Sequence, residues 1–167
     1  MSKSSKLIAR AGIVGALYIV LSMTAFPVAS GFIQFRVGEA LTILAVLFPE
    51  TAVGLAVGCA ITGLITGCQT LDIIFGSLVT LFAGVLTYLT TKKIKKPAIR
   101  YLVGGIFPVL MNAFLLPLIW YWCYGQLELL YMLQVLSIFI SQSLAVYGVG
   151  GVLYFAIIKS QNKLKKE

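Results

Sequence analysis

Histidine is absent from this chain of 167 residues, which has only three cysteines and five acidic residues. The cysteines, at positions 59, 68 and 123, show no metal-ligand spacing, and no histidine is available as a ligand or as a base. A Gly-x-x-x-x-Gly-Lys-Ser/Thr loop is also missing, so the chain carries no P-loop ATPase of its own. These absences predict a protein that is neither an enzyme nor a metalloprotein and that needs no cofactor.

The three cysteines need a different explanation from metal binding. We expect Cys59, Cys68 and Cys123 to be small buried thiols, because free cysteine is among the most buried residue types. A disulfide between Cys68 and Cys123 is the alternative, since both fall near the outer face of the membrane in the predicted topology.

Charge is scarce as well. Charged residues make up 11% of the chain, hydrophobic residues make up 60%, and the mean hydropathy is +1.01. A soluble domain would carry about twice that share of charge. Apolar runs of helical length recur, whereas the alternating pattern of a membrane barrel does not. The sequence therefore predicts an all-α integral membrane protein that forms a single domain over residues 1–167.

The basic residues predict the topology rather than a nucleic-acid partner. Short loops rich in Lys and Arg stay in the cytoplasm. At about 20 residues per crossing, the chain crosses four times between the first and second basic clusters and twice between the second and third. We predict a six-helix bundle with both termini cytoplasmic, the first helix being retained and not cleaved as a signal peptide. Twelve of the thirteen basic residues form these three clusters: Lys3, Lys6 and Arg10; Lys92, Lys93, Lys95, Lys96 and Arg100; Lys159, Lys163, Lys165 and Lys166. The predicted helices lie near residues 7–26, 37–48, 51–66, 71–90, 101–123 and 129–158.

Residues 33–41, with the sequence IQFRVGEAL, place two charged residues between apolar segments, which requires an explanation. They contain Arg36, the thirteenth basic residue, and Glu39, one of the five acids. A charge at the edge of hydrocarbon costs several kcal/mol unless it is paired or hydrated. Two explanations stay open: an interfacial salt bridge between these two residues, which are three positions apart, or a ligand site at the mouth of the bundle.

Other polar residues also gather toward the outer half of the predicted bundle. Asp72 is explained as well by the dipole of its helix as by a ligand, and Asn112 can bond to another helix. Gln142 at mid-depth should point inward. Carboxylates, amides and aromatic side chains together suit a small planar heterocycle with several N–H donors. The predicted substrate site consists of Gln34, Arg36, Glu39, Asp72, Asn112 and Gln142, with Arg36 ordering the loop by pairing with Glu39.

Small residues recur four apart in the first predicted helix. Ala11, Gly12, Gly15 and Ala16 form a face that another helix can approach closely in lipid. Packing within the same bundle and docking of a partner protein both explain this face.

With these segments the chain resembles the QueT-type queuosine-precursor transporter family, whose members are substrate-binding S components of energy-coupling-factor transporters. The resemblance covers nearly the whole chain and is most specific at residues 33–41. Ala16 to Leu21, Asp72 to Ser77 and the region of Asn112 add to it.

The resemblance implies a function that the composition does not show. An S component captures a vitamin-like solute outside a prokaryotic cell and pairs in the cell membrane with a coupling protein and two ATPases. The coupling protein would dock on Ala11, Gly12, Gly15 and Ala16, and the expected solute is a 7-deazaguanine such as 7-aminomethyl-7-deazaguanine. The family pattern places an acid beside the glycine in the sixth helix, where this chain has Gly148-Val149-Gly150, which leaves the choice of deazapurine open. The alternatives are an S component for thiamin, biotin or riboflavin, and a small membrane channel or assembly protein.

Overall fold

The structure is a computed structural model that describes residues 2–29, 36–125 and 130–164. None of these described residues forms a strand, so the prediction of an all-helical protein is confirmed for them. Among them are four helices long and apolar enough to cross a membrane, at Lys3–Thr24, Thr70–Thr91, Pro97–Cys123 and Tyr131–Lys163. Two shorter apolar helices, Val37–Val46 and Thr51–Ile65, lie between the first and second of these.

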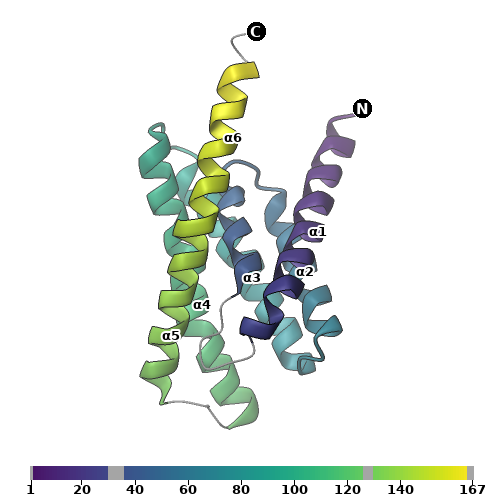
Figure 1. Cartoon of the computed structure of the whole chain (residues 1–167), viewed down its shortest axis with the longest axis vertical. Helices are drawn as coiled ribbons and strands as arrows, with labels where there is room; N and C mark the ends of the chain where they lie inside the picture. Colours follow the sequence, from purple (N-terminus) through teal and green to yellow (C-terminus); the bar gives the residue numbers. More distant parts are fainter. Residues whose placement is uncertain (1, 30–35, 126–129, 165–167) are drawn as a thin grey trace.

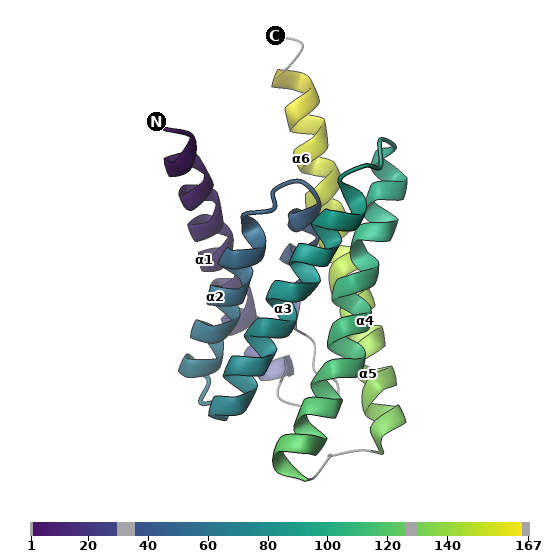
Figure 2. The ribbon, with the colours of Figure 1, turned by 180° about the vertical axis from the view of Figure 1, so that it is seen from behind.

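The last long helix is assembled from three consecutive pieces, because a π-helical turn interrupts it. The elements, in chain order, are α1 (Lys3–Ala29), the 3-10 helix η1 (Val37–Val46), α2 (Thr51–Ile65), α3 (Thr70–Thr91), α4 (Pro97–Tyr124), α5 (Tyr131–Ser143), the π-helix η2 (Leu144–Val149) and α6 (Gly150–Leu164). Figures 1 and 2 show both termini at the same end of the bundle, with α2, α3 and α4 side by side in sequence order.

Several predicted helix ends differ from the structure: α4 begins at Pro97 and not near residue 101, the last helix runs to Leu164 and not to about residue 158, and α1 ends later than predicted. The segment that begins at Pro27 was expected to break the first helix after Phe26, but α1 continues through Pro27 to Ala29. A proline removes one helical hydrogen bond and crowds the preceding turn, which weakens a helix without always ending it.

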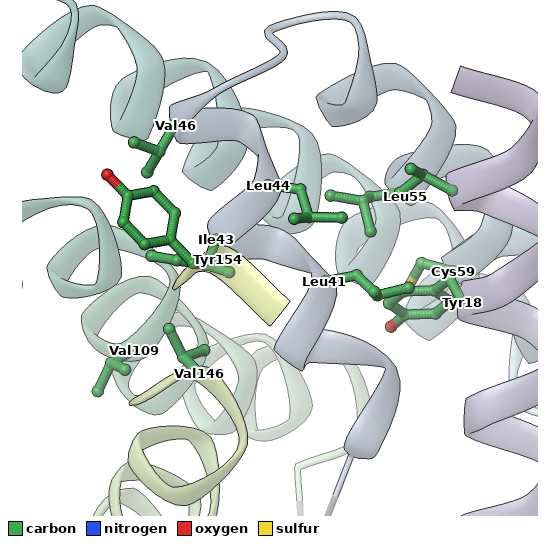
Figure 3. Packing of buried hydrophobic residues seen from close by; sticks show 11 residues of the cluster. Tyr18, Leu41, Ile43, Leu44, Val46, Leu55, Cys59, Val109, Val146 and Tyr154 are labelled. Atoms are coloured by element: carbon green, nitrogen blue, oxygen red, sulfur yellow. The ribbon is translucent and has the colours of Figure 1, made fainter. Parts of the chain in front are cut away.

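The centre of the bundle is η1, in which Glu39 and Thr42 are the only polar side chains. Its residues from Gly38 to Val46 are all buried, as expected for a helix that is largely apolar all round. It packs against α1, α2, α3, α4, η2 and α6. Figure 3 shows Leu41, Cys59 and Tyr18 together on one side of η1, and Val109, Val146 and Tyr154 on the other. The segment singled out in the sequence therefore leads directly into the core.

Helices α1 and α2 touch through their backbones. A methyl group added at Gly15 would lie 2.7 Å from the carbonyl oxygen of Gly54, and one at Gly58 would lie 2.8 Å from the carbonyl oxygen of Gly15. A methyl group added at Gly54 would lie closer still to the carbonyl oxygen of Ala11. Such close approach requires glycine at the contact, so this part of the small-residue face is used for packing within the bundle.

Candidate functional site

The candidate site is centred on Glu39, whose side chain is completely buried in the first turn of η1. The hydroxyl of Tyr18 donates a hydrogen bond to Glu39 Oε1 at 2.7 Å. The Nδ2 amide of Asn112 donates to Glu39 Oε2 at 3.3 Å. Both carboxylate oxygens are thus held, one from α1 and the other from α4.

Arg36 precedes η1 and completes this cluster. Its Nη2 atom lies 3.8 Å from Glu39 Oε1, so the predicted ion pair between residues three apart is confirmed. The same nitrogen donates to the Tyr18 hydroxyl at 3.3 Å and to Cys59 Sγ at 3.2 Å. A buried charge is tolerated when it is paired and hydrogen-bonded, and these contacts supply both conditions.

Three buried amides keep hydrogen-bonding atoms unused. Among the described residues, Asn112 Oδ1, Gln134 Oε1 and both polar atoms of Gln142 are buried without a hydrogen-bond partner. Each such atom costs on the order of 1–3 kcal/mol, and native proteins rarely leave several together. The unused set contains three carbonyl oxygens and one amino group, which is the complement of a ligand rich in N–H donors.

The contacts of α4 with α5 and η2 bracket Asn112 and Gln142 along the bundle. Toward one end, Ala113 and Leu116 pack in one cluster with Val135 and Ile138. Toward the other, a methyl group added at Gly105 would meet the ring of Tyr147. Asn112 and Gln142 lie between these two contacts, and Gln134 is on the same buried face of α5 because it is eight residues from Gln142.

Asp72 is in the first turn of α3 and is half-buried, a position that agrees with the helix-dipole explanation. One turn later, Gly76 is buried, yet a methyl group added there would meet no described atom within 4 Å. Gln34, the remaining predicted site residue, lies outside the described residues, as does the loop around Phe32.

Three residues were missed in the sequence: Tyr18 and Cys59 of the Glu39 cluster, and the buried Gln134 of α5. Tyr18 and Cys59 gave no signal, because each stands in an apolar helix where an aromatic ring or a thiol is an ordinary packing residue. Gln134 did give one: it is a glutamine within a membrane helix, and the argument applied to Gln142 holds for it equally.

The predicted docking face is divided by the structure. Gly15 is buried against α2 and Ala11 is half-buried beside it, so these two residues pack within the bundle, while docking of a partner on this face stays a prediction. Gly12 and Ala16 are exposed, and a methyl group added at Gly12 meets no described atom within 4 Å. Only 17% of the span in α1 is buried, against 33–44% in the other three long helices.

The cysteines do not all follow the prediction. Cys59 is buried, but Cys68 is exposed and Cys123 is half-buried, and all three are free. The alternative disulfide between Cys68 and Cys123 is therefore not formed. Among the described residues, no group of three or more Cys, Asp or Glu side chains is arranged to hold a metal ion.

The comparisons with known proteins agree with the resemblance seen at residues 33–41. A family model described as QueT transporter matches residues 8–159, which is nearly the whole chain. No curated protein and no solved structure matches the chain. The family is one of transporters, and the long apolar helices suit a location in a membrane. The chain therefore belongs to the QueT transporter family.

Proposed function

We propose that this chain is the substrate-binding S component of an energy-coupling-factor importer and that it captures a queuosine precursor. The ligand would be a 7-deazaguanine, with 7-aminomethyl-7-deazaguanine as the first candidate. The observation that carries the proposal is the buried carboxylate of Glu39, which is bonded by the amide of Asn112, whose own Oδ1 has no hydrogen-bond partner among the described residues. The QueT family match supports the same conclusion.

The chemistry of the cluster favours a neutral or cationic ligand. A carboxylate offers about four lone-pair sites, and Tyr18, Asn112 and Arg36 occupy up to three of them. A guanine-like edge presents N–H donors to the remaining site and to the amide oxygens, and an aminomethyl group adds a cation. Arg36 is already engaged by Glu39, and the other basic residues belong to the three clusters, which disfavours an anionic vitamin.

The proposed topology has six crossings within one domain over residues 1–167, with both termini in the cytoplasm. The position of both termini at one end of the bundle supports it (Figures 1 and 2). Crossings by η1 and α2 would be short. At 2.0 Å per residue η1 spans about 20 Å, and at 1.5 Å per residue α2 spans about 22 Å, against a hydrocarbon core of about 30 Å. A short crossing at the centre would bring the polar residues near its start closer to water.

In the proposed cycle the solute enters from outside the cell and binds at the Glu39 cluster. Hydrolysis of ATP by the two partner ATPases then drives reorientation of the subunit through the coupling protein. The exposed side of α1, with Gly12 and Ala16, is the surface that we assign to the coupling protein.

The ligand prediction is tested by calorimetric titration of the purified subunit in detergent. We expect heat of binding with 7-aminomethyl-7-deazaguanine and weaker or no heat with thiamin, biotin and riboflavin. Binding of one of those vitamins alone would make the chain an S component for another solute. If no ligand binds and no ATPase co-purifies with tagged protein, the channel or assembly alternative replaces the proposal.

The docking prediction concerns the double variant Gly12→Leu with Ala16→Leu. Two leucines on the exposed side of α1 should prevent close approach of the coupling protein, so we expect loss of the co-purifying ATPases and of uptake. The dissociation constant for the ligand should stay within about twofold, because these residues do not contact the Glu39 cluster.

Gly148→Leu is the matched control, since Gly148 is exposed on η2 and also has no described atom within 4 Å of an added methyl group. It should leave both co-purification and uptake intact. Normal uptake by the α1 double variant would mean that the coupling protein docks elsewhere.

A further inference from the structure

Tyr18 contacts both charged residues of the site through a single oxygen atom. Its hydroxyl donates to Glu39 Oε1 at 2.7 Å and accepts from Arg36 Nη2 at 3.3 Å. The side chain is 1% exposed, so water does not compete for these bonds. A hydroxyl has one hydrogen, and the Arg36 nitrogen can only donate, so the direction of both bonds follows. The Tyr18 proton must therefore point at Glu39.

The ring of Tyr18 is held as firmly as its hydroxyl. A methyl group added at Gly38 would lie 3.1 Å from Tyr18 Cδ2, and one added at Gly58 would lie 3.1 Å from Tyr18 Cβ. Gly38 immediately precedes Glu39 in η1, and Gly58 belongs to α2, which α1 contacts backbone to backbone. The packing of α1 on α2 thus fixes the position of the Tyr18 hydroxyl relative to the carboxylate of Glu39 on η1.

We propose that Tyr18 is a positioning residue of the ligand site, which fixes the Glu39 carboxylate in its binding orientation and directs the remaining acceptor capacity of that carboxylate toward the ligand. The inference rests on the proposed function, in which Glu39 receives an N–H group of the ligand. Asn112 holds the other carboxylate oxygen at the longer distance of 3.3 Å, so the bond from Tyr18 is the tighter restraint. Without it the carboxylate would turn toward Arg36, its charged partner.

The test is a double-mutant cycle between Tyr18→Phe and Glu39→Gln, read as the dissociation constant for 7-aminomethyl-7-deazaguanine. Tyr18→Phe keeps the ring and removes only the hydroxyl. We expect it to weaken binding about tenfold in the wild-type background, the order associated with one hydrogen bond to a charged group. In the Glu39→Gln background the same change should cost less than about threefold, because Tyr18 then has no carboxylate to orient.

Tyr154→Phe is the matched control. Tyr154 is also fully buried and also donates one hydrogen bond, to the backbone carbonyl of Pro97 at 3.1 Å, but it makes no bond to the Glu39 cluster. It should lower the thermal stability of the subunit and leave the dissociation constant within about twofold. A Tyr18→Phe variant that behaves like this control would overturn the inference, as would an equal loss of affinity in both Glu39 backgrounds.

The same cycle read as the thermal midpoint of unfolding in detergent needs no ligand. We expect Tyr18→Phe to lower the midpoint more in the wild-type background than in Glu39→Gln, and additive shifts would refute the link between the two side chains. If the wild-type subunit binds no deazaguanine, the proposed function fails, and this second cycle still decides whether Tyr18 holds Glu39.

Discussion

Glu39→Gln is expected to weaken binding of 7-aminomethyl-7-deazaguanine by at least about tenfold, which corresponds to roughly 1.5 kcal/mol for a charge-assisted hydrogen bond. The substitution preserves shape but removes the negative charge. It also turns one of two acceptor atoms into a donor, which faces either the hydroxyl of Tyr18 or the amide of Asn112. Arg36 would lose its counter-ion in a partly buried position, which adds to the cost. Isothermal titration with the purified variant measures the effect.

Glu50→Gln provides the control for this loss of charge. Glu50 pairs with Arg10 at 3.1 Å, and the Arg10 side chain is 49% exposed, so the pair is worth about 0–1 kcal/mol. It makes no bond to the Glu39 cluster, and the affinity for the ligand should not change. An unaltered dissociation constant in Glu39→Gln itself would reduce Glu39 to a structural ion-pair partner of Arg36 and would remove the main support for the proposed site.

The fold class and the order of the helices were accessible from the sequence because they depend on local properties. Helical apolar runs and the scarcity of charge predicted the helices, and the segment 37–48 was recognised as a short one, close to η1. The helical type was not predictable. A 3-10 helix and a π-helix differ from an α-helix by one residue in their hydrogen-bonding register, and packing around η1 and next to Gln142 decides that register.

The site was partly predictable for a similar reason. Arg36, Glu39 and Asn112 attract attention because hydrocarbon rejects unpaired polar groups, and the structure joins them in one cluster. Tyr18 could not be found in this way. An aromatic ring is compatible with an apolar helix, and only the fold brings its hydroxyl to a carboxylate 21 positions away in the sequence.

The sequence also could not show which small residues of α1 contact α2 and which are exposed. Successive residues are turned by about 100° around a helix, so Ala11 and Gly15 form one row, and Gly12 and Ala16 form the adjacent row. Both rows have the same composition and spacing. Only the position of α2, whose Gly54 and Gly58 receive the first row, distinguishes the internal contact from the exposed surface.

Gly54→Leu is therefore expected to destabilise the subunit by about 3 kcal/mol or more, the upper range for overpacking a close contact. A methyl group at Gly54 would already overlap the carbonyl oxygen of Ala11, and backbone atoms on α1 cannot move aside as a flexible side chain can. The two helices would have to separate. Tyr18 would then move away from Glu39, so ligand affinity should fall together with thermal stability in detergent.

Gly12→Leu is the control, because it also introduces a leucine but on the exposed side of α1 and not at its contact with α2. Gly12 lies one residue from Ala11 in the sequence but on the exposed row, where an added methyl group meets no described atom within 4 Å. We expect its thermal midpoint to stay close to that of the wild type, measured by fluorescence-detected size exclusion after heating. If Gly54→Leu were as stable as Gly12→Leu, the backbone contact between α1 and α2 would not exist as described. Tyr18 would then lack the fixed platform from which it reaches Glu39.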